Sequence, residues 1–104
     1  MTTFDDRENA FESKFAHDEE MKFKADARCN KMLGLWAAEQ LGKTGDDAEI
    51  YAKTVVMADF EEPGHEDVIR KVVADLEGIV HPDLVRSKRN ELLIISQAQI
   101  LKDT

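Results

Sequence analysis

Apolar residues recur at intervals of three and four along four segments of this sequence, and glycine or proline stands between the segments. This spacing places apolar side chains on one face of an α-helix and differs from the alternation of a strand. We expect a first helix from about Asp5 to Leu41, ending near Gly42, and a last helix from Pro82 to about Lys102. The sequence therefore predicts an all-α fold, a single-domain four-helix bundle with a long first helix.

Two shorter helices are expected between these. The first of them follows an N-cap at Thr44 or Asp46 and stops before Pro63. The other begins between residues 64 and 66 and closes at Gly78. Its apolar residues are Val68, Ile69, Val72, Val73 and Leu76. All five share one helical face, and we expect that face to lie in the core.

Four consecutive apolar residues, 92–95, have no diagnostic period and fit either a helix or a short strand. The flanking residues 88–91 and 97–99 lack the alternation of a strand, which favours a helix. In a helix these four side chains point to most sides. The segment is therefore expected to be central in the bundle, and the alternative is that it presents a spare apolar strip to a partner.

The size and charge of the chain exclude several classes of protein. Its 104 residues suffice for one modest core, and 22 acidic against 14 basic residues give a net charge of -8, which disfavours binding to nucleic acid. A lone Cys29 forms no intramolecular disulfide, and the first residues lack a signal peptide's apolar stretch. No apolar run approaches the roughly 20 residues that span a bilayer. We expect a cytoplasmic protein without direct membrane insertion.

An aromatic seam lies at the beginning of the expected first helix. At 100° per residue its three rings fall within about 40° of one another. The seam consists of Phe4, Phe11 and Phe15. Nearly the same line is apolar again further along, at Cys29, Leu33 and Trp36. Charged residues separate the two groups, namely Asp18, Lys22 and Asp26. A helix that faced one core along its whole length would not carry this interruption.

The stretch between the two apolar groups is expected to be a solvated helical spacer, supported by ion pairs from Asp18 to Lys22 and from Glu20 to Lys24. A helix over residues 4–41 would extend roughly 55 Å, well beyond the width of a small domain. Its beginning must project from the bundle, fold back onto it, or be disordered when free. We divide the chain into an amphipathic arm, residues 1–19, and a bundle domain, residues 20–104. The arm either docks in the groove of another protein or packs on its own bundle as ordinary core.

Several motifs that carry chemistry in other proteins are incomplete here. Gly42-Lys43-Thr44-Gly45 resembles the end of a phosphate-binding loop, but Ala37 stands where its first glycine is needed and the preceding residues are helical. A helix stop followed by a cap is the better interpretation. The three histidines, His17, His65 and His81, have no metal-ligand spacing with Cys29.

Reactive groups are also poorly supported. Cys29 is expected to be a small buried side chain, and no nucleophile, base and oxyanion hole assemble. His17 beside Asp18, Glu19 and Glu20 is expected to be an exposed bystander, with a pH sensor or a loosely bound cation as alternatives. We therefore expect no enzyme, no cofactor and no metal, and leave weak binding of an adenine nucleotide open.

A family resemblance covers most of the chain. It is carried by FDDRENAFESKFAHDEEMKFKADARCNKMLGLWAAEQLG, by YAKTVVMADFEEPG and by a final helix containing RNELL. The most specific runs are FDDRE, AFE, KFAHD and GLWAA. On these runs the sequence resembles the small alphaproteobacterial inhibitor of the F1 ATPase, the zeta subunit of F-type ATP synthase.

The resemblance implies a four-helix fold with a mobile N-terminal arm and no catalytic activity of its own. The arm would enter the catalytic α/β interface of F1, reach the rotor γ subunit and block rotation in the direction of ATP hydrolysis more than in synthesis. The protein would lie at the cytoplasmic face of the inner membrane, held there through F1. Carried over to this sequence, the inhibitory segment comprises Phe4, Asp5, Asp6, Arg7, Phe11, Glu12, Lys14, Phe15 and His17.

A second hypothesis comes from a different class of protein. In it the chain is a helical bundle that binds a small molecule or nucleotide, and the long first helix is purely structural. The two hypotheses differ in the role of the aromatic seam, which is an interface in the first and part of the core in the second.

Overall fold

The computed structural model describes the chain path of residues 3–59 and 66–103, and the side chains of residues 19–59 and 66–102. Over these ranges the chain is helical apart from turns and short connections, and no strand occurs. The helices are α1 (Thr3–Gln40), α2 (Gly45–Ala58), α3 (Glu66–Asp75) and α4 (Pro82–Asp103). The prediction of an all-α protein with four helices and a long first helix is confirmed.

Gly42 ends α1 as the sequence predicts. Its φ of 77° is left-handed, a conformation that glycine adopts at little cost. The Lys43 amide donates to the carbonyl of Ala38 at 2.9 Å, and the Gly42 amide donates to that of Glu39 at 3.0 Å. These two bonds form the Schellman arrangement, which satisfies the last carbonyls of the helix. The residues that resemble a phosphate-binding loop are therefore a helix stop.

The boundary at Thr44 is also correct, although the expected capping bond is not made. Thr44 occupies the N-cap of α2 in an extended conformation, and its side chain forms no capping hydrogen bond. Asp46 lies one residue inside the helix, where with Asp47 it places negative charge in the first turn. Acidic groups there interact favourably with the partial positive charge of the exposed amides.

The core forms where α1 meets the other three helices, because α1 contacts α2, α3 and α4. The expected face of α3 is confirmed: Val68, Ile69, Val72 and Leu76 are buried, and Val73 packs against them partly buried. The other helices contribute Cys29, Leu33, Ala37, Ala38, Tyr51, Val55, Val85 and Leu92. The same sequence pattern that predicts the helices therefore also identifies most of the core.

Residues 92–95 are helical, but their predicted central position is wrong. Leu92 is buried at 7% exposure, whereas Ile94 is 67% exposed and Ile95 is 37% exposed. Because α4 lies on the outside of the bundle with one face against α1, side chains on its far face have no helix to cover them. The alternative of a spare apolar strip is the one the structure supports.

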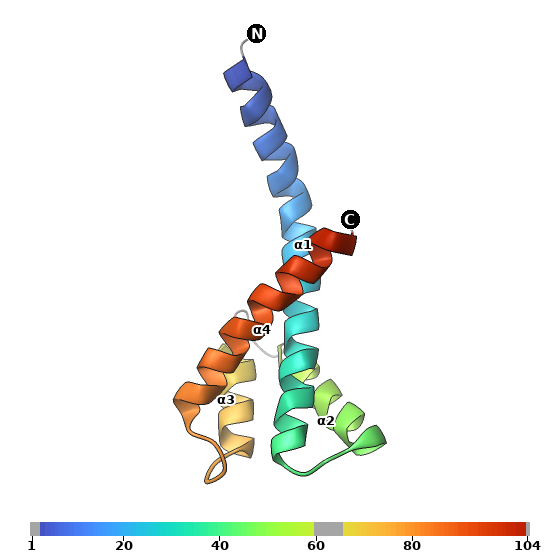
Figure 1. Cartoon of the computed structure of the whole chain (residues 1–104), viewed down its shortest axis with the longest axis vertical. Helices are drawn as coiled ribbons and strands as arrows, with labels where there is room; N and C mark the ends of the chain where they lie inside the picture. The colour runs from blue at the N-terminus through green and yellow to red at the C-terminus, as the bar shows by residue number, and fades with distance from the viewer. Residues whose placement is uncertain (1–2, 60–65, 104) are drawn as a thin grey trace.

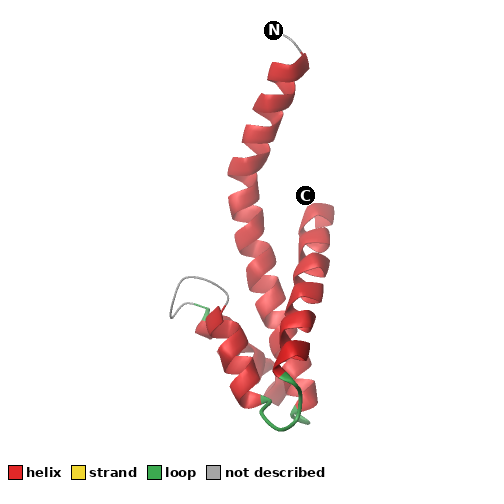
Figure 2. Cartoon of the chain, turned by 90° about the vertical axis from the view of Figure 1, so that its left-hand side faces the viewer, coloured by secondary structure: helices red, strands yellow, loops and turns green. Residues whose placement is uncertain are grey.

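The molecule is elongated because α1 is much longer than the bundle. The principal extents are 59, 25 and 22 Å. Figure 1 shows the N-terminal half of α1 continuing past the ends of the other helices, and the perpendicular view in Figure 2 shows the same projection. The C-terminal end of α4 lies beside the middle of α1. The chain therefore consists of a compact base and a helical projection.

Candidate partner-binding surface

The projecting part of α1 contains the segment that the sequence predicts to be a partner-binding arm. Figures 1 and 2 show it as a helix continuous with the part of α1 that lies in the bundle. A continuous helix transmits the orientation of the bundle to the arm, since consecutive turns are joined by backbone hydrogen bonds. The backbone of the arm is thus held out from the base.

The individual contact residues of the arm belong to this stretch of α1, but their side chains lie outside the described residues. They are Phe4, Asp5, Asp6, Arg7, Phe11, Glu12, Lys14, Phe15 and His17. Their helical backbone brings them onto one segment of about 14 residues, roughly 20 Å long. Their assignment as contact residues stays a prediction.

The junction between arm and bundle is described from Glu19 onward, and it is solvated as expected. Glu19, Glu20, Lys22 and Lys24 are exposed, and Lys24 Nζ lies 3.8 Å from Glu20 Oε1. Such an exposed pair contributes only a few tenths of a kcal/mol. The bundle therefore covers little of the spacer over residues 19–24, whereas its last turn, residues 25–28, is buried or half-buried. Among the described side chains, the first buried one along the chain is Ala25, at 2% exposure, one turn before Cys29.

Phe23 is a feature of this junction that the sequence analysis missed. Its side chain is 65% exposed although it is a large aromatic residue in the middle of α1. On the helical wheel it stands more than 90° from the line of the aromatic seam. Phe23 does not lie on the line through the aromatic seam and the buried residues of α1. The signal that marks it in the sequence is an aromatic residue off that line, among charged neighbours.

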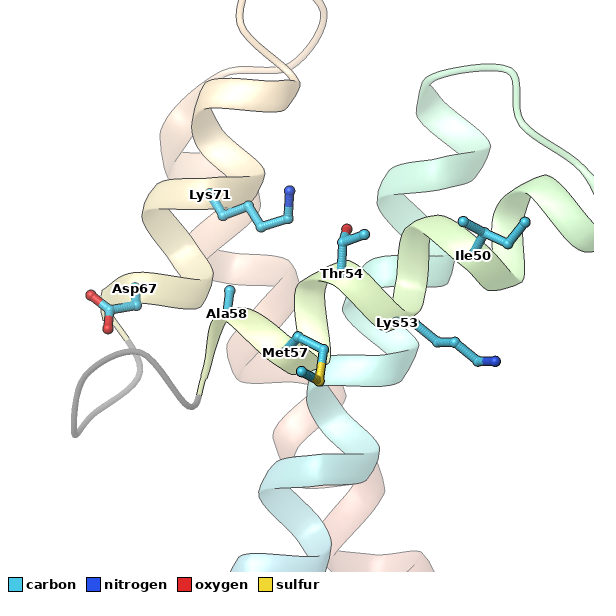
Figure 3. A pocket seen from close by; sticks show the side chains of 7 residues that line it. All are labelled: Ile50, Lys53, Thr54, Met57, Ala58, Asp67 and Lys71. Atoms are coloured by element: carbon cyan, nitrogen blue, oxygen red, sulfur yellow. The ribbon is translucent and has the colours of Figure 1, made fainter.

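A shallow groove between α2 and α3 is the second candidate surface (Figure 3). It is lined by Ile50, Lys53, Thr54, Met57, Ala58, Asp67 and Lys71. Ile50 and Met57 are 61% and 62% exposed, so the groove has an apolar wall open to solvent. This site offers burial to a small apolar group, together with two ammonium groups.

One of those ammonium groups is already engaged. Lys71 Nζ lies 3.0 Å from Asp75 Oδ2 and 5.4 Å from the centre of the Tyr51 ring. The Tyr51 hydroxyl donates to the same carboxylate oxygen at 2.8 Å, and burial together with this bond raises the pKa of the phenol. Asp75 thus ties α2 to α3 at the edge of the groove, and a ligand there would compete with Asp75 for Lys71.

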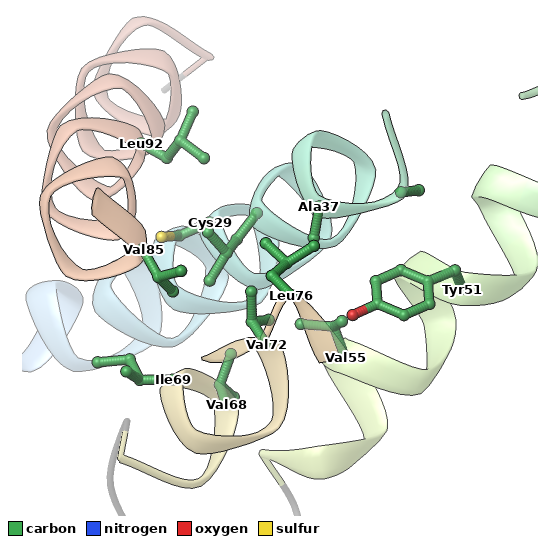
Figure 4. Close-up of a cluster of buried hydrophobic side chains, with 12 residues drawn as sticks. Cys29, Ala37, Tyr51, Val55, Val68, Ile69, Val72, Leu76, Val85 and Leu92 are labelled. Carbon is green, nitrogen blue, oxygen red and sulfur yellow. The ribbon is translucent and has the colours of Figure 1, made fainter. Parts of the chain in front are cut away.

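Cys29 is buried, as predicted, and its sulfur points toward α4 (Figure 4). The thiol is fully inaccessible and lies 3.5 Å from the Arg89 carbonyl oxygen, to which it donates. Burial raises the pKa of this thiol, an effect that the charge of Arg89 opposes. A neutral, inaccessible thiol is a poor nucleophile, so Cys29 is part of the core.

The described side chains contain no cluster of three or more His, Cys, Asp or Glu residues that could hold a metal ion. His81 is exposed, with Nδ1 3.7 Å from an oxygen of Asp83, while His17 and His65 lie outside the described side chains. Within the part of the chain that the structure covers, no helix combines the length and hydropathy of a membrane span.

Comparison with known proteins identifies the family of this chain. The family model for ATPase inhibitor subunit zeta matches residues 1–99. No curated protein matches the chain. A protein solved in solution by NMR is 54% identical, with a TM-score of 0.73, over 81% of this chain and 99% of its own. The match to the family model spans both the arm and the bundle, and the chain belongs to the ATPase inhibitor subunit zeta family.

Proposed function

We propose that this protein is a regulatory inhibitor that blocks ATP hydrolysis by the F1 part of ATP synthase, and that its N-terminal arm does so by insertion. In this proposal residues 1–19 enter the catalytic α/β interface as an amphipathic helix and reach the rotor γ subunit. Membership of an ATPase inhibitor family supports the inhibitory role. The insertion mechanism is what the resemblance to that family implies, and the projection of α1 from the bundle supports it.

The observation that carries the proposal is the continuation of α1 beyond the bundle (Figure 1). Three phenylalanines fall on one line of the part of α1 whose backbone projects from the bundle. An amphipathic helix that lies in the groove of a partner buries such a line, and each ring contributes roughly 2 kcal/mol when fully covered. The seam therefore supplies the binding free energy that insertion requires.

Charged residues on the arm give the insertion its specificity. Arg7 and Lys14 can pair with carboxylates of the partner, while Asp5, Asp6 and Glu12 can pair with basic groups. A bound helix needs no chemistry to inhibit a rotary enzyme, because tight binding to one rotational state lowers the population of the others. In this proposal the protein therefore inhibits by binding and carries out no catalysis of its own.

The cellular location follows from the partner in this proposal. A protein bound to F1 lies at the cytoplasmic face of the inner membrane without entering the bilayer. Fractionation with and without F1 tests this, and we expect the protein to sediment with membranes only when F1 is present.

The test of the function measures ATP hydrolysis by F1 from the same organism in the presence of the purified protein. The full-length chain is compared with a chain lacking residues 1–19, and circular dichroism verifies that the shortened chain is folded. We expect the full-length protein to inhibit and the shortened protein to leave the rate unchanged. Equal hydrolysis rates with and without the full-length protein would refute the proposal.

A small-molecule-binding bundle is the second candidate function, and the groove between α2 and α3 is the observation that favours it (Figure 3). An anionic ligand with an apolar portion could place the latter on Ile50 and Met57 and its charge near Lys53. Chemical shift changes of the Ile50 and Met57 methyl groups on addition of ATP would support this function. Unchanged shifts at millimolar ATP would remove the nucleotide from consideration.

A further inference from the structure

The C-terminal half of α4 is apolar on two opposite faces. Residues 92–101 carry no charged side chain, although 35% of the whole chain is charged. Leu92, Ser96 and Ile100 are buried on one face, at spacings of four. The opposite face bears Ile94, Ala98 and Leu101, which are exposed and which we call the outer strip. One helix face is sufficient to attach α4 to α1, so the fold does not account for the second.

The three side chains of the outer strip adjoin one another, which distinguishes them from exposed hydrophobic residues that stand alone. Ile94 and Leu101 are 67% and 56% exposed, and Ala98 lies between them at the i+4 position of the first. Neighbours at i+3 and i+4 lie one above the other on a helix, so the three side chains form a single stripe. Isolated exposed leucines are normal, whereas neighbouring exposed apolar side chains form a patch that a partner can cover.

The position of the strip relates it to the arm. The Arg28 side chain donates to Gln99 Oε1 at 3.3 Å, and Ser96 Oγ lies 3.5 Å from Met32 Sδ. These contacts place the last turns of α4 beside the part of α1 that leads into the projection (Figures 1 and 2). A partner that binds the whole length of the arm therefore comes close to the C-terminal end of α4 before it reaches the rest of the bundle.

A second copy of the chain is a poor occupant for the strip. A specific stable interface buries roughly 800 Å² on each partner and 20–30 residues a side. The outer strip offers three side chains over two helical turns. It is too small to hold two copies together, but it can add to an interface whose main contact lies elsewhere.

We propose that the outer strip is a second contact with the partner that takes up the arm, and that it binds an uncharged, apolar patch on the F1 surface beside the mouth of the groove. This inference rests on the proposed function. The two contacts are joined through α1, so binding at one holds the other at high effective concentration. The strip then adds to the affinity of the complex, while insertion of the arm produces the inhibition.

The test compares full-length variants for binding to F1 and for inhibition of its ATP hydrolysis. The strip variant is Ile94→Gln with Leu101→Gln, because glutamine retains helix propensity and removes the apolar contact. The matched control is Ile79→Gln with Leu84→Gln, at the connection before α4 and in its first turn, where the original side chains are 54% and 51% exposed and line neither candidate surface. We expect the strip variant to bind at least tenfold more weakly and still to inhibit fully at saturation. The control should match the wild type, and all three melting temperatures should agree.

Three outcomes would overturn the inference. An unchanged affinity of the strip variant, with a wild type that inhibits, leaves the proposed function standing and removes the strip from the interface. A wild type that dimerises in sedimentation through the strip, with unchanged affinity for F1, assigns the strip to a second copy. A wild type that neither binds nor inhibits F1 refutes the proposed function and the inference together.

Discussion

Gly34 on α1 lies against the backbone of Ala52 on α2. A Cβ built at position 34 would come within 2.7 Å of the Ala52 Cα and 3.1 Å of its Cβ. Because the nearest atom belongs to a helix backbone, no side-chain rotation relieves that contact. The absence of a side chain at Gly34 therefore sets how closely α1 and α2 approach, in the interior of a helix where glycine is otherwise unfavourable.

Replacement of Gly34 by alanine is expected to destabilise the protein. Alanine favours the helix by about 1 kcal/mol, but overpacking a tight contact costs about 1–3 kcal/mol. With a backbone atom as the obstacle we expect a net loss of about 1 kcal/mol, seen as a lower melting temperature. Ser87→Ala, at an exposed position of α4, is the control and should leave the melting temperature equal or slightly higher. If the Gly34→Ala protein were more stable than the wild type, α1 and α2 would be able to move apart at this contact without a cost in free energy.

Local sequence signals predicted the boundaries of the helices. Gly42 adopts the positive φ that a helix stop requires, and Pro82 begins α4 with a φ that suits the first turn. The conformational preferences of glycine and proline depend only on residues within a few positions of the helix end. They can therefore be recognised in the sequence without knowing how the helices pack. The buried face of α3 was predictable for a similar reason, because the spacing of its apolar residues places them all on one side of the helix.

The sequence could not show which faces of a helix other helices cover. Residues 92–95 are apolar on most sides, and only the position of α4 outside the bundle decides that Ile94 is exposed. Likewise, nothing local to Gly34 indicates the approach of Ala52. The arm was predicted from the break in its apolar line. The roles of its individual side chains depend on a partner and stay predictions.

Alkaline pH is expected to reveal the buried hydroxyl of Tyr51. Burial and the bond to Asp75 raise the pKa of this phenol above its ordinary value of about 10. The unfolded chain then loses the proton first, so the stabilisation is complete below about pH 10 and declines as the pH rises further. Melting temperatures between pH 8 and 11 should fall more steeply for the wild type than for Tyr51→Phe.

The same variant provides its own control at neutral pH. Tyr51→Phe loses the 2.8 Å bond to Asp75, which should cost about 1 kcal/mol, while Lys71 still pairs with that carboxylate. Cys29 also has a raised pKa, but it titrates in both proteins and cancels in the comparison. Parallel curves for the two proteins up to pH 11 would contradict the assignment.

The pair between Glu66 and Arg86 should be visible in an acid titration. Two bonds of 3.0 Å join the guanidinium on α4 to both carboxylate oxygens at the start of α3. Hydrogen bonding to Arg86 lowers the pKa of Glu66 below its ordinary range. NMR titration of the Glu66 carboxyl should give a midpoint below about 4.3 in the wild type and a higher midpoint in Arg86→Gln.

Stability should follow this titration only weakly, because both groups are exposed to solvent and screened. The contribution of the pair is present above the unfolded pKa and is lost as the pH falls through the lowered value. Arg86→Lys retains the charge without the fork of two donors, so its Glu66 midpoint should lie between the other two. Identical midpoints in all three proteins would show that the pair does not persist in solution.

Removal of two rings from the arm should separate inhibition from stability. The double variant Phe11→Ala with Phe15→Ala loses most of the aromatic seam, so we expect inhibition of ATP hydrolysis to weaken by about tenfold or more. Its melting temperature should stay close to that of the wild type, because the arm projects from the bundle (Figure 1). Hydrolysis assays and thermal unfolding on the same preparations test both statements.

Phe23→Ala is the matched control for that variant. Phe23 is an exposed phenylalanine on the same helix, 65% accessible, but it lies at the junction and away from the line of the seam. Its replacement should leave both inhibition and melting temperature near the wild-type values. If the double variant instead unfolded at a much lower temperature than the control, Phe11 and Phe15 would be packed against the bundle. The seam would then be core, and insertion would require it to detach first.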